Sequence, residues 1–439
     1  MFKKSSLLQK LQTPSNLRAS WYEINRSNRF SSGLSRITIE DFFSHLNENL
    51  RLIRRQLKNG EYVFSPVKGI PIFKKQIHER SKKPKKRGIR IAEVRDRVVQ
   101  RGIARIIEPF LFKKYQLDNG VSFAYLSGRG VRQALNQMVV YYLDGNPIVF
   151  EADIVKFFDT VDRKKLLEEM VFPGLPDESI NGLISDALNQ EIGNWSKLSN
   201  EDKSLFPDSG IPQGGGLSPL FANVYLYKFD KIMQKHGYKL IRYADDFIIM
   251  CADKTEALNA HDLAKQIIEG SLKLKMHELN IDNSGKTRII QITQDVFEFL
   301  GTRFNGRRLW PSSQKVQIVT DRIREITEFT EEKTLLRTLN ELKSLIEGWV
   351  SAYCHTDLEP YAGMIDETLR NRLGVFLHLI GWKNKRDSLT EKQLDSSGIQ
   401  SISVALEMQR EKMNSLQRES FSGLWTKQPI AQDGKRTVL

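Results

Sequence analysis

The sequence has few cysteines and no long hydrophobic run. Its two cysteines, Cys251 and Cys354, are too few for a disulfide scaffold or a four-cysteine zinc module. No window approaches the roughly 18 consecutive apolar residues that a membrane-spanning helix needs. The N-terminus also lacks the apolar core of a signal peptide. We therefore expect a protein of the reducing cytoplasm, with no membrane partner.

Acidic residues are outnumbered by basic ones. The 439 residues include 67 Lys and Arg against 53 Asp and Glu, which gives a formal net charge of +14 at pH 7. Such an excess favours a polyanionic partner, because each neutralised phosphate releases counterions. Plain solubility would explain the same surplus, so charge alone leaves nucleic-acid binding open. The length allows two or three domains.

The densest basic run is RSKKPKKRGIR, residues 80–90. Pro84 and Gly88 argue against a helix here and predict a loop or hairpin tip. A solvated loop and a phosphate-contacting finger are both compatible with such a run. If the run contacts RNA, the candidate residues are Arg80, Lys82, Lys83, Lys85 and Lys86.

Helical and extended patterns alternate along the rest of the chain. Apolar spacing predicts helices over 38–62 (capped by Thr38), 94–115, 163–170, 220–237 and 403–417, and a mostly helical chain after about 320. Short apolar runs predict a strand at 148–150 and hairpins around Ala244–Asp246 and over 296–309, the latter turning at Asn305-Gly306.

Three carboxylates stand at the ends of predicted strands. Asp245 and Asp246 lie in the turn of RYADDFIIM (242–250), and Asp153 follows the strand at 148–150. If these strands are neighbours, the carboxylates converge, which is unfavourable unless cations occupy the gap. Two Mg²⁺ ions about 3.5–4 Å apart need such hard oxygen ligands and support nucleotidyl transfer. An ordinary solvent-exposed turn is the alternative, since Asp is a common turn former.

The motif series resembles a reverse transcriptase of the bacterial group II intron lineage. FEADIVKFFDTVD (150–162), GIPQGGGLSPLFANVYLYKFD (210–230), YADD, LNIDNSGKTRII (279–290) and FEFLGTRF (297–304) are similar to its catalytic motifs, in order. KRGIRIAEVRDRVVQ (86–100) and FAYLSGRGVRQAL (123–135) resemble its fingers motifs. LKSLIEGWVSAYC (342–354) resembles its maturase-type thumb.

This resemblance implies an α+β right-hand polymerase with fingers, an antiparallel palm sheet and an α-helical thumb. The expected divisions are N-terminal extension and fingers 1–149, palm 150–310, thumb 311–385 and tail 386–439. The implied activity is RNA-directed DNA synthesis with two Mg²⁺ ions, or Mn²⁺. The implied partners are dNTPs, a structured noncoding RNA template and the cDNA product in an RNA–DNA duplex. The oligomeric state stays open.

The resemblance also assigns roles to individual residues. Asp153 and Asp245 would be the principal metal ligands, with Asp246 and the backbone carbonyl of Ile154 in support, and Lys286 would protonate pyrophosphate. Phe158 would be the steric gate against ribose. The incoming nucleotide would be contacted by Arg87, Lys74, Lys75, Gln213 and Gly214. In the thumb, Arg370 and Arg372 would follow the duplex backbone.

Several segments depart from the intron-encoded pattern. Two cysteines cannot build the zinc-containing endonuclease that intron proteins often carry, and RGIRIAEVRD lacks their RPLGIP form. SSGLSRITIEDF lacks the aspartate that is usual in the family's AGVDG-like segment. Gly216 stands where the family has an aliphatic residue. We therefore favour a stand-alone, defence-associated reverse transcriptase that copies a noncoding RNA during phage infection. An intron maturase or RNA chaperone is the alternative. A diguanylate-cyclase-like palm is set aside, because no GGDEF-type segment occurs.

Overall fold

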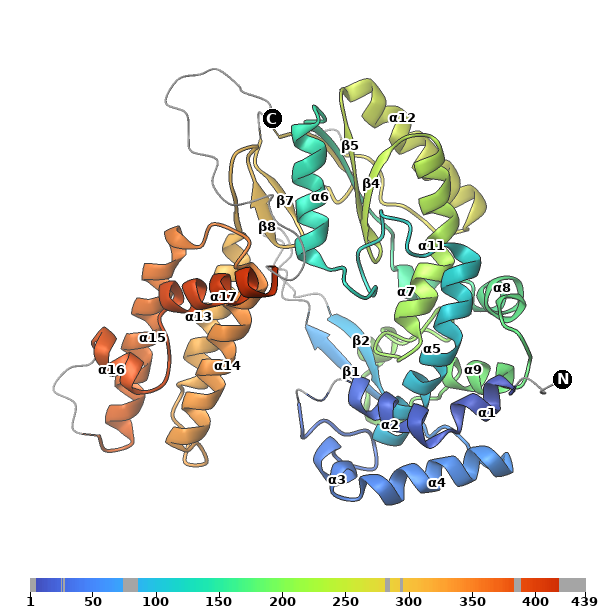
Figure 1. The fold of residues 1–439 in the computed structure, drawn as a ribbon, viewed down its shortest axis with the longest axis horizontal. Coiled ribbons are helices and arrows are strands. Elements are labelled where there is room, and N and C mark those ends of the chain that lie inside the picture. Colours follow the sequence, from blue (N-terminus) through green and yellow to red (C-terminus); the bar gives the residue numbers. More distant parts are fainter. Residues whose placement is uncertain are drawn as a thin grey trace. The chain divides into compact units, whose positions relative to one another are not determined.

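The computed structural model describes residues 5–24, 26, 28–73, 86–280, 285–292, 295–382 and 388–417. The chain forms two compact units, Met1–Gln291 and Ile292–Leu439 (Figure 1). Helices accompany three antiparallel sheets, so the α+β class is confirmed. None of the helices within the described ranges is long and apolar enough to span a bilayer.

The first unit begins with four helices: α1 (Leu7–Leu11), α2 (Pro14–Glu23), α3 (Ile39–Ser44) and α4 (Leu46–Asn59). The prediction of a single helix over 38–62 is wrong, because the helix is interrupted at His45. There the side-chain amide of Asn49 donates to the carbonyl of Phe42, which a continuous helix would bond from the backbone. The predicted Thr38 cap is confirmed as a capping box with Asp41.

Strands β1 (Lys68–Phe73) and β2 (Lys86–Ile91) form an antiparallel pair, with Ile72 opposite Arg87. The connecting residues 74–85 lie outside the described part of the chain. Helix α5 (Val94–Tyr115) follows as predicted and buries Val98, Val99, Ile103 and Ile107, and α6 (Val131–Leu143) comes next.

The central sheet has the strand order β4-β5-β3-β6. Its strands are β3 (Ile148–Asp153), β4 (Lys239–Tyr243), β5 (Asp246–Cys251) and β6 (Arg288–Gln291). Helices α11 (Ser218–Lys235) and α12 (Lys254–Lys265) pack against the sheet (Figure 1). Aromatic contacts fix this packing: Phe229 of α11 lies 4.9 Å from Phe247, and His261 of α12 lies 5.5 Å from Phe150, between ring centroids.

Short helices fill the chain between β3 and α11. They are α7 (Phe157–Thr160), α8 (Arg163–Lys165), the π-turn η1 (Leu166–Val171), η2 (Phe172–Gly174), α9 (Asn181–Leu188), η3 (Trp195–Lys197) and α10 (Asn200–Lys203). The helix predicted at 163–170 is therefore present but widens into a π-turn. A second π-turn, η4 (Gln266–Ser271), extends α12.

The second unit starts with a three-stranded sheet of β7 (Phe297–Phe299), β8 (Thr302–Phe304) and β9 (Leu309–Pro311). The single hairpin predicted over 296–309 missed the tight turn between β7 and β8. Leu300 and Gly301 both adopt positive φ there, of 51° and 76°. The predicted Asn305-Gly306 turn joins β8 to β9.

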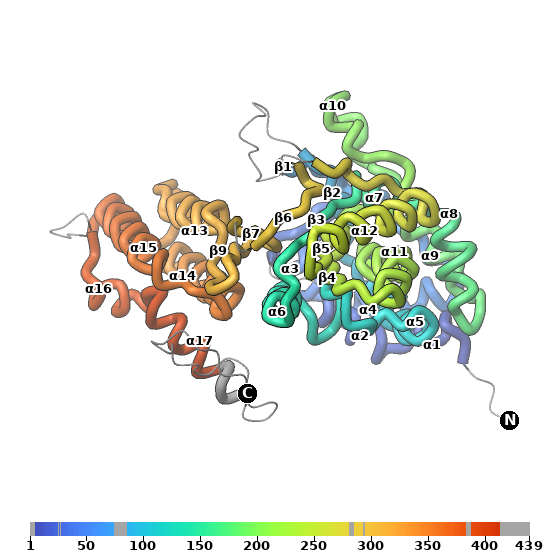
Figure 2. The backbone as a smooth tube through the Cα atoms, turned by 90° about the horizontal axis from the view of Figure 1, so that it is seen from above, coloured from blue at the N-terminus to red at the C-terminus, as the bar shows by residue number. Residues whose placement is uncertain are grey.

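Five helices complete the second unit: α13 (Ser313–Ile326), α14 (Leu335–Tyr353), α15 (Glu359–Leu379), α16 (Glu391–Ser396) and α17 (Ile402–Gln417). Figure 2 shows α13, α14 and α15 side by side, with α17 packed on them. Their core includes Ile323, Leu342, Ile346, Leu369 and Leu373. Leu336 of α14 points away from this core and is exposed.

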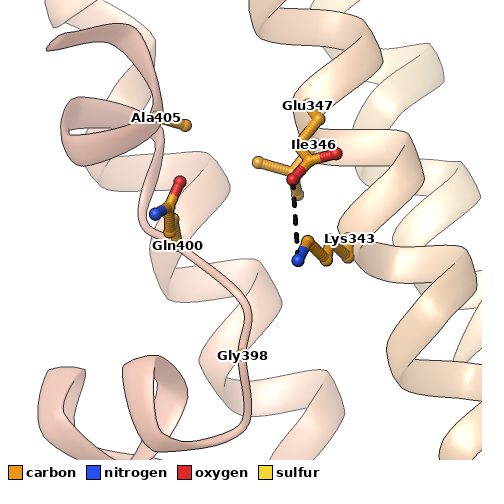
Figure 3. Close-up of a pocket in the computed structure, with 6 residues that line it drawn as sticks. All are labelled: Lys343, Ile346, Glu347, Gly398, Gln400 and Ala405. Carbon is orange, nitrogen blue, oxygen red and sulfur yellow. Dashed lines mark ion pairs between the residues drawn. The ribbon is translucent and has the colours of Figure 1, made fainter. Parts of the chain in front are cut away.

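A hollow lies between α14 and the start of α17, lined by Lys343, Glu347 and Gln400 (Figure 3). Lys343 and Glu347 form a surface ion pair at 3.9 Å, so their charges offset each other. Glu347 is the one carboxylate among the described residues that line the hollow.

The division after Gln291 is coarser than the predicted one and places β7–β9 with the thumb helices. The predicted boundaries at 149/150, 310/311 and 385/386 stay predictions.

Candidate active site

The register of β3 and β5 pairs Asp153 directly with Asp246. Residues directly opposite in an antiparallel pair share a face, with Cβ atoms about 4.5–5.5 Å apart. Asp245 lies one residue before Asp246, in the two-residue turn that joins β4 to β5 after Tyr243. The predicted convergence of these strand ends is confirmed.

Repulsion and burial act on Asp246. Burial, followed by the charges of Asp245 and Asp153, raises the pKa of Asp246 to about 7, while Lys286 lowers it. Asp246 as a residue is nevertheless open to solvent at the surface. Water therefore screens the repulsion, and its effect on stability is smaller than that pKa shift alone would give.

A lysine and a histidine of the chain itself lie beside Asp153. The Nζ of Lys286 contacts Oδ2 of Asp153, and Nε2 of His277 lies 3.7 Å from the same oxygen. The backbone amide of His277 also donates to the carbonyl of Asp153. These contacts hold the end of β3 between the hairpin carboxylates and the segment leading into β6.

The donor chemistry fits a hard divalent cation. Carboxylates from Asp153, Asp245 and Asp246 supply oxygen ligands, which Mg²⁺ and Mn²⁺ prefer. The Asp153 carbonyl points toward the 275–277 segment, where it accepts from the His277 amide. Successive carbonyls of an extended chain alternate in direction, so the Ile154 carbonyl faces away from that segment. Within the described ranges, no three His, Cys, Asp or Glu side chains are already gathered closely enough to hold a metal. A metal at Asp153 would therefore have to displace the Lys286 amine.

Phe158 and Asp159 lie in the chain that follows β3, where they contact the segment of Gln213. Phe157 is buried in the core, whereas Phe158 is half-buried and packs edge-on against it. The Phe158 carbonyl accepts a hydrogen bond from the amide of Ile211. The side chain of Gln213 donates to Asp159 at 3.2 Å. Segments 150–162 and 210–230 are therefore joined at this point.

The glycine loop 214–216 packs on the fingers strand rather than being merely flexible. Gly214 has a φ of 97°, and a Cβ there would lie 2.7 Å from the carbonyl oxygen of Arg90. The amide of Arg90 donates to the carbonyl of Gln213, and the amide of Gly216 donates to the side chain of Gln100. The loop needs glycine for this approach to β2 and α5.

The predicted basic contacts fall into two groups. Arg87 is exposed on β2, whereas Lys86 pairs with Asp202 at 2.8 Å. In the second unit, Arg370 lies 3.5 Å from Glu391, and Arg372 donates to Thr327. The remaining predicted residues lie outside the described part of the chain: Lys74, Lys75, Arg80, Lys82, Lys83 and Lys85.

The sequence analysis missed His277, Tyr125 and Arg242. The alternation in LKMHE, with Leu274 and Met276 buried, could have indicated the extended segment that carries His277. Tyr125 has a φ of 62°, and Asp245, Asp246 and Arg87 all act on its pKa, which burial raises. No local pattern indicates it. Arg242 precedes the carboxylates but is wholly buried.

The family model for reverse transcriptase (RNA-dependent DNA polymerase) matches residues 73–304, more than half of the chain. The chain belongs to the reverse transcriptase family. The matched range contains Asp153, Asp245, Asp246 and Lys286, so all four lie in the polymerase region. Reverse transcriptases use divalent metals in general, in keeping with the carboxylate donors.

Two curated relatives resemble this reverse transcriptase. Protein YkfC of Escherichia coli is 26% identical over 307 residues, covering 60% of this chain and 73% of YkfC. The group II intron-encoded protein LtrA of Lactococcus lactis subsp. cremoris is 24% identical over 303 residues, covering 66% of this chain and 47% of LtrA. The predicted group II-like lineage is confirmed. The chain spans about half the length of LtrA.

Two solved structures match parts of the chain at low similarity. A partial Cas6-RT-Cas1–Cas2 complex matches 65% of this chain and 44% of its own, at 23% identity and a TM-score of 0.34. Telomerase from Candida albicans matches 86% of this chain and 68% of its own, at 12% identity and a TM-score of 0.40. The expected right-hand polymerase fold follows from the reverse transcriptase membership.

Proposed function

We propose that this reverse transcriptase copies a bound, structured noncoding RNA into cDNA by two-metal nucleotidyl transfer. The observation that carries the proposal is the pairing of Asp153 with Asp246, next to Asp245 in the turn. Three acidic side chains at one sheet edge repel each other unless cations hold them. The excess of 14 positive charges supports a nucleic-acid partner.

Bound Mg²⁺, or Mn²⁺, would lower the pKa of the primer 3′-hydroxyl and neutralise charge on the leaving pyrophosphate. Asp153, Asp245 and Asp246 would hold the ions, with the carbonyl of Ile154. Lys286, once released from Asp153, would give its proton to pyrophosphate.

The incoming nucleotide would be positioned by the fingers and the segment after β3. The Phe158 ring would exclude a ribose 2′-hydroxyl, while Gln213 and Gly214 would contact the new base pair. Arg87 would contact the triphosphate, with Lys74 and Lys75 as further candidates. Arg80, Lys82, Lys83, Lys85, Lys86, Arg370 and Arg372 would contact RNA or duplex phosphates. Lys86, Arg370 and Arg372 would first have to leave their partners within the chain.

Primer extension on an RNA template tests the catalytic proposal. Asp245→Ala/Asp246→Ala should abolish synthesis and leave RNA affinity within about twofold of wild type, since other residues provide the phosphate contacts. Asp262→Ala is the matched control, because that carboxylate lies exposed on α12. Synthesis by the double variant at the wild-type rate would refute the proposal.

We further propose a role in antiviral defence. The support is the departure of residues 87–96 and of Gly216 from the intron-encoded pattern, together with the group II-like lineage. A maturase or RNA chaperone remains the second candidate, because LtrA is a group II intron-encoded protein. The two candidates differ in whether the carboxylates are needed.

Sequencing the RNA and DNA that co-purify from the host separates the two roles. One compact noncoding RNA in both wild type and the Asp245→Ala/Asp246→Ala variant, with cDNA only in wild type, supports the defence role. Loss of phage protection in that variant is expected as well. An intron with spliced exons, formed independently of the aspartates, would establish the maturase.

A further inference from the structure

We propose that Arg242 is a positioning residue that holds the Ala244–Asp245 turn, and with it Asp246 at the start of β5, through the carbonyl of Ala244. Arg242 is itself clamped by Asp230 of α11. This inference rests on the proposed two-metal function, since it concerns the geometry of the same carboxylates. Within the described part of the chain, the side chain of Arg242 bonds Asp230, Asn223 and Ala244, none of which is assigned to nucleotide binding.

The ion pair beneath the turn is fully enclosed. The side chains of Arg242 and Asp230 are each only 1% exposed. Nε of Arg242 donates to Oδ1 of Asp230, and Nη2 donates to Oδ2, both at 2.6 Å. Two parallel hydrogen bonds fix the plane of a guanidinium, which a single contact does not do.

The third nitrogen of Arg242 reaches the turn. Nη1 donates to the carbonyl oxygen of Ala244 at 3.0 Å and to Oδ1 of Asn223 at 3.1 Å. Ala244 has a φ of 60°, a left-handed conformation that is uncommon for a residue with a Cβ. Such a conformation persists where the surroundings over-determine it, and Arg242 supplies that constraint.

The clamp is braced from a third segment. Asn119 donates to Oδ2 of Asp230 at 2.9 Å, and its own Oδ1 accepts from the amides of Val121 and Ser122. The amide of Arg242 donates to the carbonyl of Val121, and its carbonyl accepts from the amide of Phe123. Helix α11, strand β4 and the loop after α5 therefore all converge on one arginine.

A buried ion pair is a poor source of stability, because desolvating both charges offsets their attraction. Apolar side chains of similar volume would fill the space as well. An apolar pair could not, however, donate a hydrogen bond to the Ala244 carbonyl as Nη1 of Arg242 does. The pair therefore sets where Asp245 and Asp246 stand, more than whether the palm folds.

Arg242→Lys is the variant that separates position from fold, because it keeps the charge but loses the fixed plane and the donor to Ala244. We expect the single-turnover rate of nucleotide addition to fall about 10- to 100-fold, as displacements near 1 Å do. The Mg²⁺ concentration for half-maximal rate should rise, while the KM for dNTP stays close to wild type. The rate is measured per active site, from burst amplitude.

Tyr115→Phe provides the matched control. It deletes a buried hydrogen bond, from the Tyr115 hydroxyl to the Met170 carbonyl, between α5 and η1. This control should lower thermal stability and leave the rate per active site and the Mg²⁺ dependence unchanged.

The outcomes are distinct. An Arg242→Lys variant with a wild-type rate per active site and wild-type Mg²⁺ dependence overturns the inference, even if fewer molecules fold. If Arg242→Lys does not fold, Asp230→Asn decides by the same criteria, since it breaks one of the two parallel hydrogen bonds that fix the guanidinium plane. A wild-type protein that extends no primer with Mg²⁺ or Mn²⁺ would instead refute the proposed function itself.

Discussion

Asp246 holds its proton more tightly in the folded, metal-free protein than an ordinary aspartate does. Burial and the neighbouring Asp245 and Asp153 raise its pKa from 3.8 to about 7. Between these two values, the folded state binds more protons than the unfolded state, so stability falls as pH rises. The destabilisation is absent below about pH 4 and complete above about pH 7.

The melting temperature of the metal-free protein should therefore drop between pH 5 and pH 8 by more than in Asp246→Asn. The corresponding difference in the free energy of unfolding should be only about 1 kcal/mol, because solvent screens an exposed carboxylate. Added Mg²⁺ should raise the melting temperature more at pH 8 than at pH 6, since the ligand must be ionised. Calorimetry across this range measures both effects. An equal pH dependence in Asp246→Asn would contradict the assignment.

Phe158 differs from its neighbour Phe157 in having one side free. Phe157 is 1% exposed and belongs to the core, whereas Phe158 is half-buried. If Phe158 is the gate, Phe158→Val should raise the efficiency of rNTP use relative to dNTP use about 10- to 100-fold, the scale of a lost steric contact. Phe158→Tyr keeps the ring and should retain discrimination. Unchanged selectivity in the valine variant would assign Phe158 to packing alone.

At the scale of elements, strands β1 and β2 pack against the segment that connects α9 to α11. Asn194 bonds both the amide and the carbonyl of Gly69, at 2.8 and 2.9 Å. A Cβ on Gly88 would lie 2.4 Å from the carbonyl oxygen of Leu205 and 2.7 Å from the Phe206 ring. The strands can approach this segment so closely only because Gly69 and Gly88 have no Cβ.

Gly88→Ala should therefore lift β2 and displace Arg87, the next residue along the strand. We expect a several-fold higher KM for dNTP with unchanged Mg²⁺ dependence, and a loss of stability of about 1–3 kcal/mol from overpacking. Steady-state kinetics and denaturant unfolding give the two values. Gly182→Ala on α9 is the control, because no atom lies within 4 Å of the added Cβ. A wild-type KM in Gly88→Ala would separate Arg87 from nucleotide binding.

Sequence patterns predicted elements better than their ends and partners. The pairing of β3 with β5 could be predicted, because one apolar run ends at a carboxylate and the other begins at one. The break at His45 could not, since it depends on the Asn49 side chain replacing a backbone donor. The role of Arg242 could not either, because its partner Asp230 is defined only once α11 and β4 pack together. Lys286 was predicted from resemblance, but its contact with Asp153 required the structure.

At the scale of the whole molecule, the described residues form two separate hydrophobic cores. One spans buried residues from Leu7 to Met276, and the other spans Val316 to Leu406. Each core belongs to one of the two compact units. Separate cores can unfold as separate cooperative units.

Calorimetry should accordingly resolve two unfolding transitions. Leu226→Ala and Leu369→Ala form a matched pair, since both leucines are fully buried, one in each core. Each variant should lose about 2–5 kcal/mol in its own transition and leave the other unchanged. A single transition shifted equally by both variants would show that the two units unfold as one.

The seating of the β1–β2 hairpin has a mechanical consequence. Its base is fastened at Gly69 by Asn194 and at Arg90 by the backbone of Gln213. A flap swinging as a rigid body from that base would break these bonds and drag Gln213 out of place. A movement of Arg87 toward a nucleotide would instead require β1 and β2 to bend between these two fixed positions and their ends at Phe73 and Lys86. In the proposed nucleotide site, Gln213 would then keep its position while Arg87, farther along β2, moves.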